Sequence, residues 1–330
     1  MNQIYFLILK FSSPMTFKSS LIRALFFSIF ALSFAFCKKD STGSYSTASN
    51  VSYEMTDAPS DDPNVQGVFV TVVAIKVNGT TISNFNKTTL DLTAYQRGTT
   101  KVIGNADLSA GTYSNITLVL DNGYDQYGAA PGCYVVTKSS GKKAIASAAA
   151  TTEITLSGTF KSVDNQSSAA VIDFDIRKAI VYDGNSGYKF VTGSELTSSV
   201  RVVQKSESGV ITGSTTNTST NNSDKVIVYV YKKGTYTKST EMQGQGSSNV
   251  QFKNAVSSCA VLNNSYELHF LESGDYELHF ISYKANNSSG KLDVQGEFTA
   301  NIIGGLNIGS LTVATSATVT ANTTLGLIVP

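Results

Sequence analysis

Residues 271–276 read LESGDY and residues 108–113 read LSAGTY, so the pattern Leu-x-x-Gly-x-Tyr occurs twice in the chain. Each copy runs directly into residues that alternate between apolar and polar side chains, at 113–120 and 276–283. Such alternation is typical of a β-strand with one buried face. Two copies of one pattern, each leading into a strand, suggest that the same structural unit is used twice.

In a β-sandwich this pattern turns a corner between strands. The leucine closes one end of the core, the glycine permits a positive φ, and the tyrosine hydroxyl bonds to nearby backbone. We therefore expect two sandwich domains in series. The six corner residues are Leu108, Gly111, Tyr113, Leu271, Gly274 and Tyr276.

The rest of the chain is also strand-like. Residues 68–77 (VFVTVVAIKV) end at Asn78 and Gly79, a pair typical of two-residue hairpin turns. Residues 225–232 (KVIVYVYK) alternate and place both tyrosines on one side. No helical period of useful length occurs, so the sequence predicts an all-β fold of two immunoglobulin/transthyretin-like β-sandwich domains in tandem.

The expected domain boundaries follow the composition of the chain. Residues 1–36 form a signal peptide, 37–50 a lipidated tether, 51–207 the first sandwich domain and 208–330 the second. Residues 214–223 contain no apolar side chain and predict a loop within the second domain.

The N-terminus has the form of an export signal. Lys18 and Arg23 precede the apolar residues 24–36, a run too short for a comfortable membrane span, which stops at Cys37. This ending resembles the signal of bacterial lipoproteins of the Bacteroidetes type, which implies a lipid on Cys37 and attachment to the outer membrane, facing the periplasm or the exterior. An ordinary N-terminal membrane anchor is the alternative. Met15 begins a signal of more usual length.

The charge of the chain selects no partner. Export would remove Lys10, Lys18 and Arg23 with residues 1–36, which leaves 22 basic and 24 acidic side chains and a net charge of −2. No basic cluster is present, so nucleic acid is not an expected partner.

One family resemblance covers residues 50–205. Met55-Thr56-Asp57-Ala58-Pro59 stands before a valine-rich strand, and the first corner and then Asp173-Phe174-Asp175 follow. This order resembles a family of envelope lipoprotein domains of unknown function with a Thr-Asp-Ala-Pro signature. The resemblance implies an immunoglobulin- or transthyretin-like sandwich and supplies no activity.

The second domain resembles transthyretin-like appendage domains. Three features carry this resemblance: the opening Gly-x-Ile-x-Gly of residues 209–213, the tyrosine-bearing strand and the second corner. Its tail, residues 311–330, is strand-like, and we expect it to be the closing edge strand. The tail could instead complete a neighbour's sheet.

Two acidic stretches are candidate calcium sites, because a hard cation takes six to eight oxygen ligands. Turn formation by Asp and Asn is the default explanation of both stretches. The carboxylates concerned are Asp57, Asp61, Asp62, Asp121 and Asp125.

Both histidines lie in a repeat, Tyr-Glu-Leu-His-Phe, at 266–270 and 276–280. In a simple hairpin His269 would face Glu277 and Glu267 would face His279, and two imidazoles with two carboxylates can hold Zn²⁺. A corner would separate the four side chains, and we take solvated residues on separate strands as the default.

Two further predictions concern single residues. Cys133 and Cys259 are expected to be separate buried thiols rather than a disulfide, since nothing local brings them together. Ser41, in Asp-Ser-Thr, is a candidate O-glycosylation acceptor.

No catalytic constellation can be assembled from named residues, and no cofactor is expected. The sequence therefore predicts a non-catalytic, lipid-anchored envelope protein that acts as a binding or structural module, with an envelope protein or an extracellular polymer as partner. Two alternatives remain open: a fimbrillin-like subunit that assembles by strand addition, and a glycan-binding accessory lipoprotein.

Overall fold

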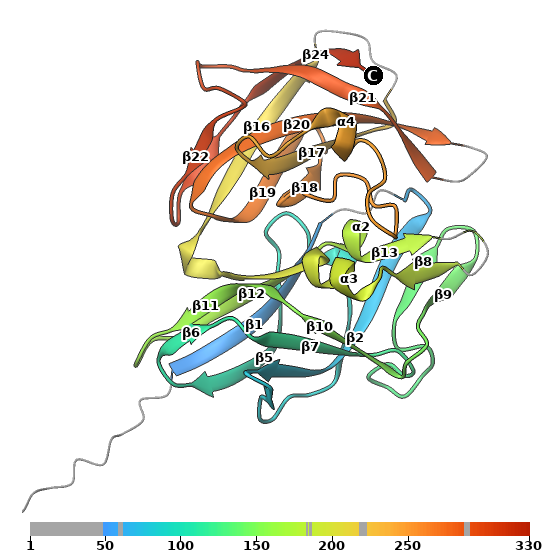
Figure 1. The fold of residues 1–330 in the computed structure, drawn as a ribbon, viewed down its shortest axis with the longest axis vertical. Helices are drawn as coiled ribbons and strands as arrows, with labels where there is room; N and C mark the ends of the chain where they lie inside the picture. Colours follow the sequence, from blue (N-terminus) through green and yellow to red (C-terminus); the bar gives the residue numbers. More distant parts are fainter. Residues whose placement is uncertain (1–48, 59–61, 183, 185–186, 218–222, 287–290) are drawn as a thin grey trace, which may run out of the picture. The chain divides into compact units, whose positions relative to one another are not determined.

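The computed structural model describes residues 49–58, 62–182, 184, 187–217, 223–286 and 291–330 (Figure 1). The chain from Thr47 to Pro330 forms one compact unit. The predicted signal segment 1–36, the predicted lipidation site Cys37, Ser41 and Asp61 lie outside the described residues. No helix in the described ranges is long and apolar enough to cross a membrane.

The described residues are nearly all β, so the prediction of an all-β fold is confirmed. The strands form two groups of sheets, which we call the N-terminal group (residues 49–204) and the C-terminal group (residues 208–329). Helical turns are short: η1 Leu92–Ala94, α2 Ile176–Ala179, α3 Gly193–Ser199, η2 Lys205–Glu207 and α4 Lys238–Glu241. The turn η2 lies between the two groups.

The first sheet of the N-terminal group has the order β5-β1-β12-β15-β11-β6. Its strands are β1 Ser49–Asp57, β5 Lys101–Leu108, β6 Gly111–Tyr113, β11 Ser157–Ser162, β12 Ser168–Phe174 and β15 Val200–Gln204. Only Ser109 and Ala110 separate β5 from β6, although these strands stand at opposite ends of the order. The sheet is therefore curled until its two edges approach each other.

The second sheet of this group has the order β10-β7-β2-β8-β9-β14-β13, with β3 and β4 also paired to β2. Its strands are β2 Val65–Val77, β3 Thr80–Thr81, β4 Thr88–Asp91, β7 Ile116–Asp121, β8 Tyr134–Thr137, β9 Gly141–Ala146, β10 Thr151–Thr155, β13 Ile180–Tyr182 and β14 Tyr188–Phe190. The predicted hairpin turn joins β2 to β3, with positive φ at both Asn78 (50°) and Gly79 (81°). Positive φ at both positions is the requirement of a type I′ turn.

The core of the N-terminal group contains side chains from both sheets. Tyr53 and Met55 on β1 and Val70 and Ile75 on β2 are fully buried in one apolar cluster. Burial of each such side chain contributes about 1.5–3 kcal/mol. The opposite face of the first sheet is covered as well, because Phe270 packs on residues of β12 and β15.

The C-terminal group is one sheet in the order β18-β17-β20-β21-β24-β16-β19, with β22 paired to β20 and β23 to β16. Its strands are β16 Ser208–Asn217, β17 Lys225–Lys232, β18 Ser257–Ala260, β19 Ser265–Glu272, β20 Gly274–Asn286, β21 Lys291–Ile302, β22 Leu311–Val313, β23 Thr318–Thr320 and β24 Thr323–Val329. The end strands β18 and β19 follow each other in sequence and meet through a bridge between Leu262 and Ser265. This sheet therefore also curls back on itself.

Two sequence predictions about this group are wrong. The tail is not an edge strand, because β24 lies between β21 and β16 and pairs with both. The loop predicted at 214–223 is strand over residues 214–217, whose Thr215 and Thr216 pair with Thr323 and Thr324. Polar composition concealed the strand at residues 214–217, since threonine is as well suited to a strand as to a loop.

Each Leu-x-x-Gly-x-Tyr segment forms a corner with the same internal hydrogen bond. Tyr113 Oη donates to the carbonyl oxygen of Ser109 over 2.8 Å, and Tyr276 Oη donates to that of Glu272 over 2.7 Å. The glycines have φ of 159° at Gly111 and 150° at Gly274. The strands on either side of the second corner, β19 and β20, do not pair with each other.

Candidate functional site

The two pieces of the sequence signature lie side by side on neighbouring strands. β1 and β12 pair in parallel, with Thr56 opposite Asp173 and Asp57 opposite Phe174. Both strands end here, and α2 follows β12 directly. Three carboxylates consequently meet in the protein interior, since Asp57, Asp173 and Asp175 are each at most 6% exposed.

Asp57 is the least compensated of these acids. Its Oδ1 accepts the backbone N–H of Ile176 over 3.0 Å, whereas its buried Oδ2 has no hydrogen-bond partner among the described residues. Burial raises the pKa of Asp57 well above the usual range, and the nearby Asp175 and Asp173 act in the same direction.

Asp175 is surrounded by cations. It is the N-cap of α2, and its Oδ2 lies 3.2 Å from Nη2 of Arg177 and 3.4 Å from Nζ of Lys178. Burial acts to raise the pKa of Asp175, but Arg177 and Lys178 outweigh it and lower the pKa. Burial lowers the pKa of Lys178, and Asp175 opposes that effect.

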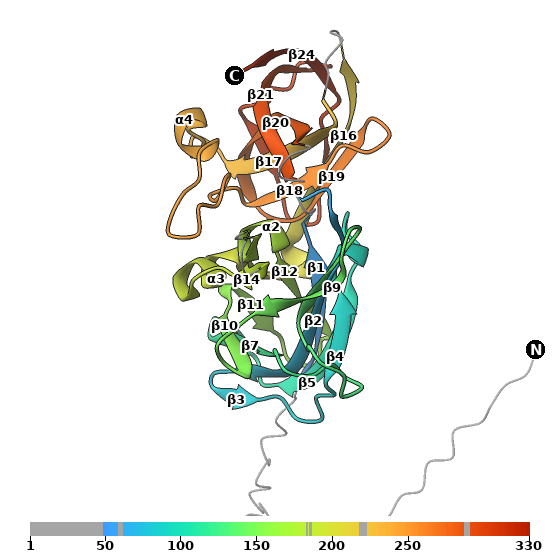
Figure 2. The same ribbon diagram turned by 90° about the vertical axis from the view of Figure 1, so that its right-hand side faces the viewer.

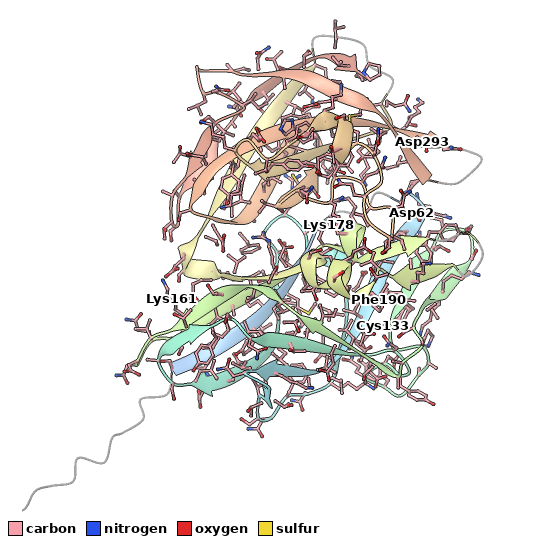
Figure 3. The ribbon with its side chains drawn as sticks, in the orientation of Figure 1. Asp62, Cys133, Lys161, Lys178, Phe190 and Asp293 are labelled. Atoms are coloured by element: carbon pink, nitrogen blue, oxygen red, sulfur yellow. The ribbon has the colours of Figure 1, made fainter. Side chains whose placement is uncertain are left out.

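The same cations reach the C-terminal group. Arg177 donates to the carbonyl oxygens of Gln251 (2.6 Å) and Phe252 (3.2 Å), and Lys178 donates to that of Ala255 (3.0 Å; Lys178 is labelled in Figure 3). These contacts place α2 against the segment that follows α4 (Figure 2).

Arg201, on β15, makes a parallel connection. Its Nε and Nη2 bind Oδ2 of Asp173 over 3.0 and 2.6 Å, and its Nη1 donates to the carbonyl oxygen of Phe270 over 2.9 Å. We call Asp57, Asp173, Asp175, Arg177, Lys178 and Arg201 the junction cluster. In this cluster Asp173 and Asp175 bind the basic side chains. The basic side chains donate their other hydrogen bonds to carbonyl oxygens of the C-terminal group.

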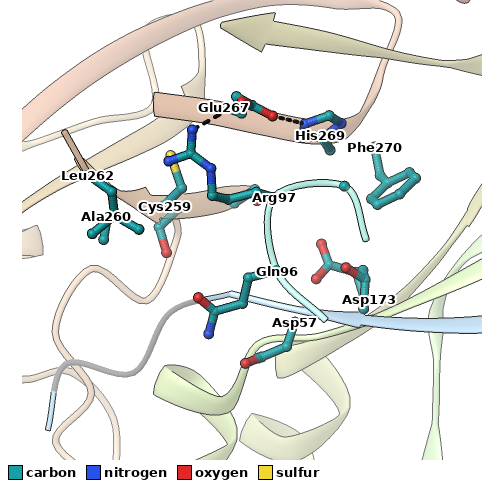
Figure 4. Close-up of a pocket in the computed structure, with 14 residues that line it drawn as sticks. Asp57, Gln96, Arg97, Asp173, Cys259, Ala260, Leu262, Glu267, His269 and Phe270 are labelled. Carbon is teal, nitrogen blue, oxygen red and sulfur yellow. Dashed lines mark hydrogen bonds and ion pairs between the residues drawn. The ribbon is translucent and has the colours of Figure 1, made fainter. Parts of the chain in front are cut away.

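A small cavity adjoins the junction cluster (Figure 4). Its volume is about 30 Å³, room for about one or two water molecules. On one wall Arg97 Nη2 binds Glu267 Oε1 over 3.0 Å, and His269 Nε2 lies 3.0 Å from Glu267 Oε2. The His269 ring lies over Gly98, where an added Cβ would come within 2.5 Å of it. A cavity of this volume does not accommodate an organic substrate.

The predicted metal residues do not come together. His269 is paired with Glu267, whereas His279 Nδ1 lies 2.6 Å from Glu297 Oε1. Glu277 accepts the backbone N–H of Tyr236 over 2.9 Å. Because β19 and β20 form a corner, the hairpin that would have assembled the site does not exist. The described residues contain no group of three or more His, Cys, Asp or Glu placed to hold a metal ion.

The predicted calcium ligands are used in local hydrogen bonds. Asp62 Oδ1 accepts the N–H of Asn64 over 2.9 Å, and its Oδ2 accepts the hydroxyl of Tyr188 over 2.8 Å. Asp57 is buried at the junction, and Asp61 lies outside the described residues. This first acidic stretch therefore does not present its described carboxylates jointly to a cation.

The second acidic stretch forms two Asx turns. Asp121 Oδ1 accepts the N–H groups of Gly123 and Tyr124 over 2.8 and 3.0 Å, and Asp125 Oδ1 accepts those of Tyr127 and Ala129, both over 2.9 Å. Donation from Ala129 is the first cause that lowers the pKa of Asp125. Turn chemistry accounts for both carboxylates.

Cys133 and Cys259 are both buried and free (Cys133 is labelled in Figure 3). Burial raises the pKa of each thiol to about 12. A thiol that stays protonated in an apolar site is unreactive, so both residues serve packing.

Sequence reasoning missed the basic half of the junction cluster. Arg177 and Lys178 follow the Asp-Phe-Asp motif immediately, and that proximity was the available signal. Their partners lie far along the chain, at residues 251–255, so no local pattern identified them.

Residues 48–191 match a family model described as a domain of unknown function (DUF4382). The match includes both pieces of the signature, Thr56-Asp57 and Asp173-Phe174-Asp175. No curated protein matches the sequence.

Several solved structures show a distant likeness. The minor pilin GBS52 of Streptococcus agalactiae is 11% identical, with 86% of this chain and 97% of that chain covered and a TM-score of 0.20. Mfa2, the fimbrial anchor protein of Porphyromonas gingivalis, is 11% identical, with coverages of 74% and 80% and a TM-score of 0.20. The TIE protein of Bacillus anthracis is 10% identical with a TM-score of 0.19, and this chain spans 35% of its length. Backbones with TM-scores this low do not superpose as one fold, so these likenesses say nothing about the role of this chain.

Proposed function

We propose that the protein is a non-catalytic, lipid-anchored component of the cell envelope that acts as a binding or structural module. The observation that carries this proposal is the junction cluster. It contains the largest set of buried ionisable side chains described above, and these side chains hold the N-terminal and C-terminal groups together. Most of their donors and acceptors are engaged in structure, and the cavity beside the unpaired Oδ2 of Asp57 is too small for an organic substrate, so they are not disposed as acid, base or nucleophile.

Attachment to the membrane rests on the sequence alone. A basic segment, an apolar run and Cys37 in that order support export followed by lipidation of Cys37. The lipid would hold the folded residues close to the membrane surface through the short polar tether, residues 37–50.

Metabolic labelling with an alkyne fatty acid tests the anchor. We expect the wild-type protein to incorporate the label and to fractionate with membranes, and we expect Cys37→Ser to abolish both. Cys133→Ala is the matched control, because this buried thiol has no part in export, and it should retain the label. Label on the Cys37→Ser protein, or none on the wild type, would refute lipidation at this residue.

The membrane face is decided by protease treatment of intact and lysed cells, with an antibody to the C-terminal group as readout. Loss of signal on intact cells would indicate the exterior, and protection until lysis would indicate the periplasm.

The fimbrial alternative requires that a strand be exchanged between subunits. β24, the strand closest to the C-terminus, is paired with β16 and β21 of its own chain. Donation of β24 would open this sheet, so the structure favours the module that remains a single chain. Glycosylation of Ser41 stays a separate proposal, and an intact-mass spectrum without added hexose would refute it.

A further inference from the structure

An open polar groove crosses the N-terminal group, away from the junction cluster. Its volume is about 510 Å³, and it lies between β5 and the segment that joins β3 to β4. None of its lining residues is basic, and Asp107 is the only acid among them. The side chains that give it hydrogen-bonding capacity include Asn50, Ser83, Asn84, Asn86, Asn105 and Asp107.

Local packing fixes the shape of this groove. The ring of Phe85 rests on Gly104 of β5, where an added Cβ would lie 3.0 Å from Cδ2 of that ring. Asn84 has a φ of 57°, in the left-handed region that asparagine tolerates. On the opposite wall, Asn50 Nδ2 donates to Asp107 Oδ1 over 3.0 Å. The backbone of both walls and the amide of Asn50 are therefore set before any ligand arrives, which reduces the entropic cost of binding.

A loop with two exposed tyrosines adjoins the same segment. Tyr124 and Tyr127, on residues 122–132, are 58% and 86% exposed. Lys87, which stands between the groove residues Asn86 and Thr88, binds Asp121 Oδ2 over 2.7 Å at the base of this loop.

The loop is also fixed by its middle residues. Gln126 and Thr89 exchange two hydrogen bonds, from Gln126 N–H to Thr89 Oγ1 (2.8 Å) and from Thr89 N–H to Gln126 Oε1 (3.0 Å). With the two Asx turns of Asp121 and Asp125, these bonds hold the loop that presents both tyrosines. The two rings are thus exposed aromatic surfaces on a loop whose backbone is held in place.

We propose that the groove and the tyrosine loop bind a neutral saccharide. Amide side chains present donors and acceptors together, as sugar hydroxyls do, so each asparagine can satisfy a hydroxyl in either role. Tyrosine offers an apolar face to the C–H face of a pyranose ring and a hydroxyl at its edge. Without a basic side chain, the groove has no partner for sulfate, phosphate or uronic carboxylate. Its volume suits about two or three sugar rings.

This inference names a ligand class for the binding role proposed above and rests on that role. Its test uses purified protein, so it fails or succeeds independently of lipidation and of the membrane face. The full-length chain is purified in a detergent without a sugar headgroup. It is titrated calorimetrically with neutral hexasaccharides (β-1,4-glucan, β-1,3-glucan, β-1,4-mannan, α-1,4-glucan and β-1,4-xylan) and with two anionic ones, from polygalacturonate and heparin.

We expect at least one neutral hexasaccharide to bind and neither anionic one to bind as tightly. The double variant Asn84→Ala/Asn105→Ala should weaken that binding at least about tenfold, and Tyr127→Ala about fivefold, since each hydrogen bond or stacking contact contributes about 1 kcal/mol. Asn301→Ala, at an exposed position on β21, and Tyr182→Ala are the matched controls and should bind as the wild type does.

Three results would overturn the proposal: no neutral hexasaccharide binds at 10 mM, an anionic one binds more tightly, or the groove variants bind as well as the wild type. Thermal unfolding of each variant accompanies the titration. A groove variant that has lost its fold is replaced by Asn86→Ala, at an exposed position, which should weaken binding about fivefold.

Discussion

Asp57 and Asp175 are two buried carboxylates of one cluster with opposite electrostatics. Both are removed from water, which by itself raises a carboxyl pKa. Arg177 and Lys178 lie beside Asp175 and reverse that effect, whereas Asp57 meets one backbone N–H and two further acids. The pKa of Asp175 is therefore lowered and that of Asp57 is raised. The two residues should contribute oppositely to the pH dependence of stability.

The variant Asp57→Asn tests the raised pKa. Because the folded pKa of Asp57 exceeds its unfolded value, the native state holds the proton more tightly, and the stabilisation is fully present below about pH 4, the unfolded pKa. It is lost as the pH rises toward the folded pKa. Asparagine cannot lose a proton. The free energy of unfolding of Asp57→Asn should therefore rise relative to that of the wild type as the pH rises, by at most about 1.4 kcal/mol per pH unit. Urea unfolding between pH 4.5 and 7.5 measures the difference.

The control for this measurement is Asp164→Asn, at an exposed carboxylate. Its free energy of unfolding should follow that of the wild type at a constant offset. A constant offset for Asp57→Asn as well would show that Asp57 is ionised in the folded protein, contrary to its environment.

Among the elements, those with local causes were predictable from the sequence. Asn78 and Gly79 form the expected hairpin turn because both residues accept a positive φ, a property of the residues themselves. The two corners likewise depend on a tyrosine and a carbonyl four residues before it. The position of β24 was not predictable, because β16 and β21, which it joins, are chosen by the closure of the whole sheet.

Removal of one hydroxyl at each corner tests the role of this element. Tyr276→Phe removes the hydroxyl of a fully buried side chain and with it the hydrogen bond to the carbonyl of Glu272, and should lower the free energy of unfolding by about 1–2 kcal/mol. Tyr113→Phe should cost less, about 0.5–1 kcal/mol, because water can replace the donor at this more exposed corner. Urea unfolding of each variant measures both changes in the free energy of unfolding.

Tyr127→Phe is the matched control, since this side chain is 86% exposed, and its midpoint should not move. Equal midpoints for Tyr276→Phe and the wild type would mean that the hydroxyl does not stabilise the corner.

On the scale of the whole molecule, the junction cluster and the groove are assembled from distant parts of the sequence. Asp173 and Arg201 lie on neighbouring strands, yet the third partner, the carbonyl oxygen of Phe270, belongs to the C-terminal group. The groove joins asparagines of β1, β5 and the β3–β4 segment. The residue types were visible in the sequence, but their proximity follows from strand pairing, which no local pattern specifies.

A double-mutant cycle on Asp173 and Arg201 tests this connection. Either single change, Asp173→Leu or Arg201→Met, leaves a largely buried charge without its partner and should cost about 3–5 kcal/mol. The double variant removes both charges and should recover a large part of that loss. The cycle is measured by urea unfolding. Costs that simply add would show that the two side chains act independently.

The pairing of β16 with β24 has a consequence for the kinetics of folding. Thr216 and Thr324, which pair in parallel, are 108 residues apart in the sequence. Such a contact forms only after a long loop has closed, and the loss of entropy on closing that loop comes before the contact stabilises the chain. The C-terminal sheet should therefore close in a late and slow step of folding.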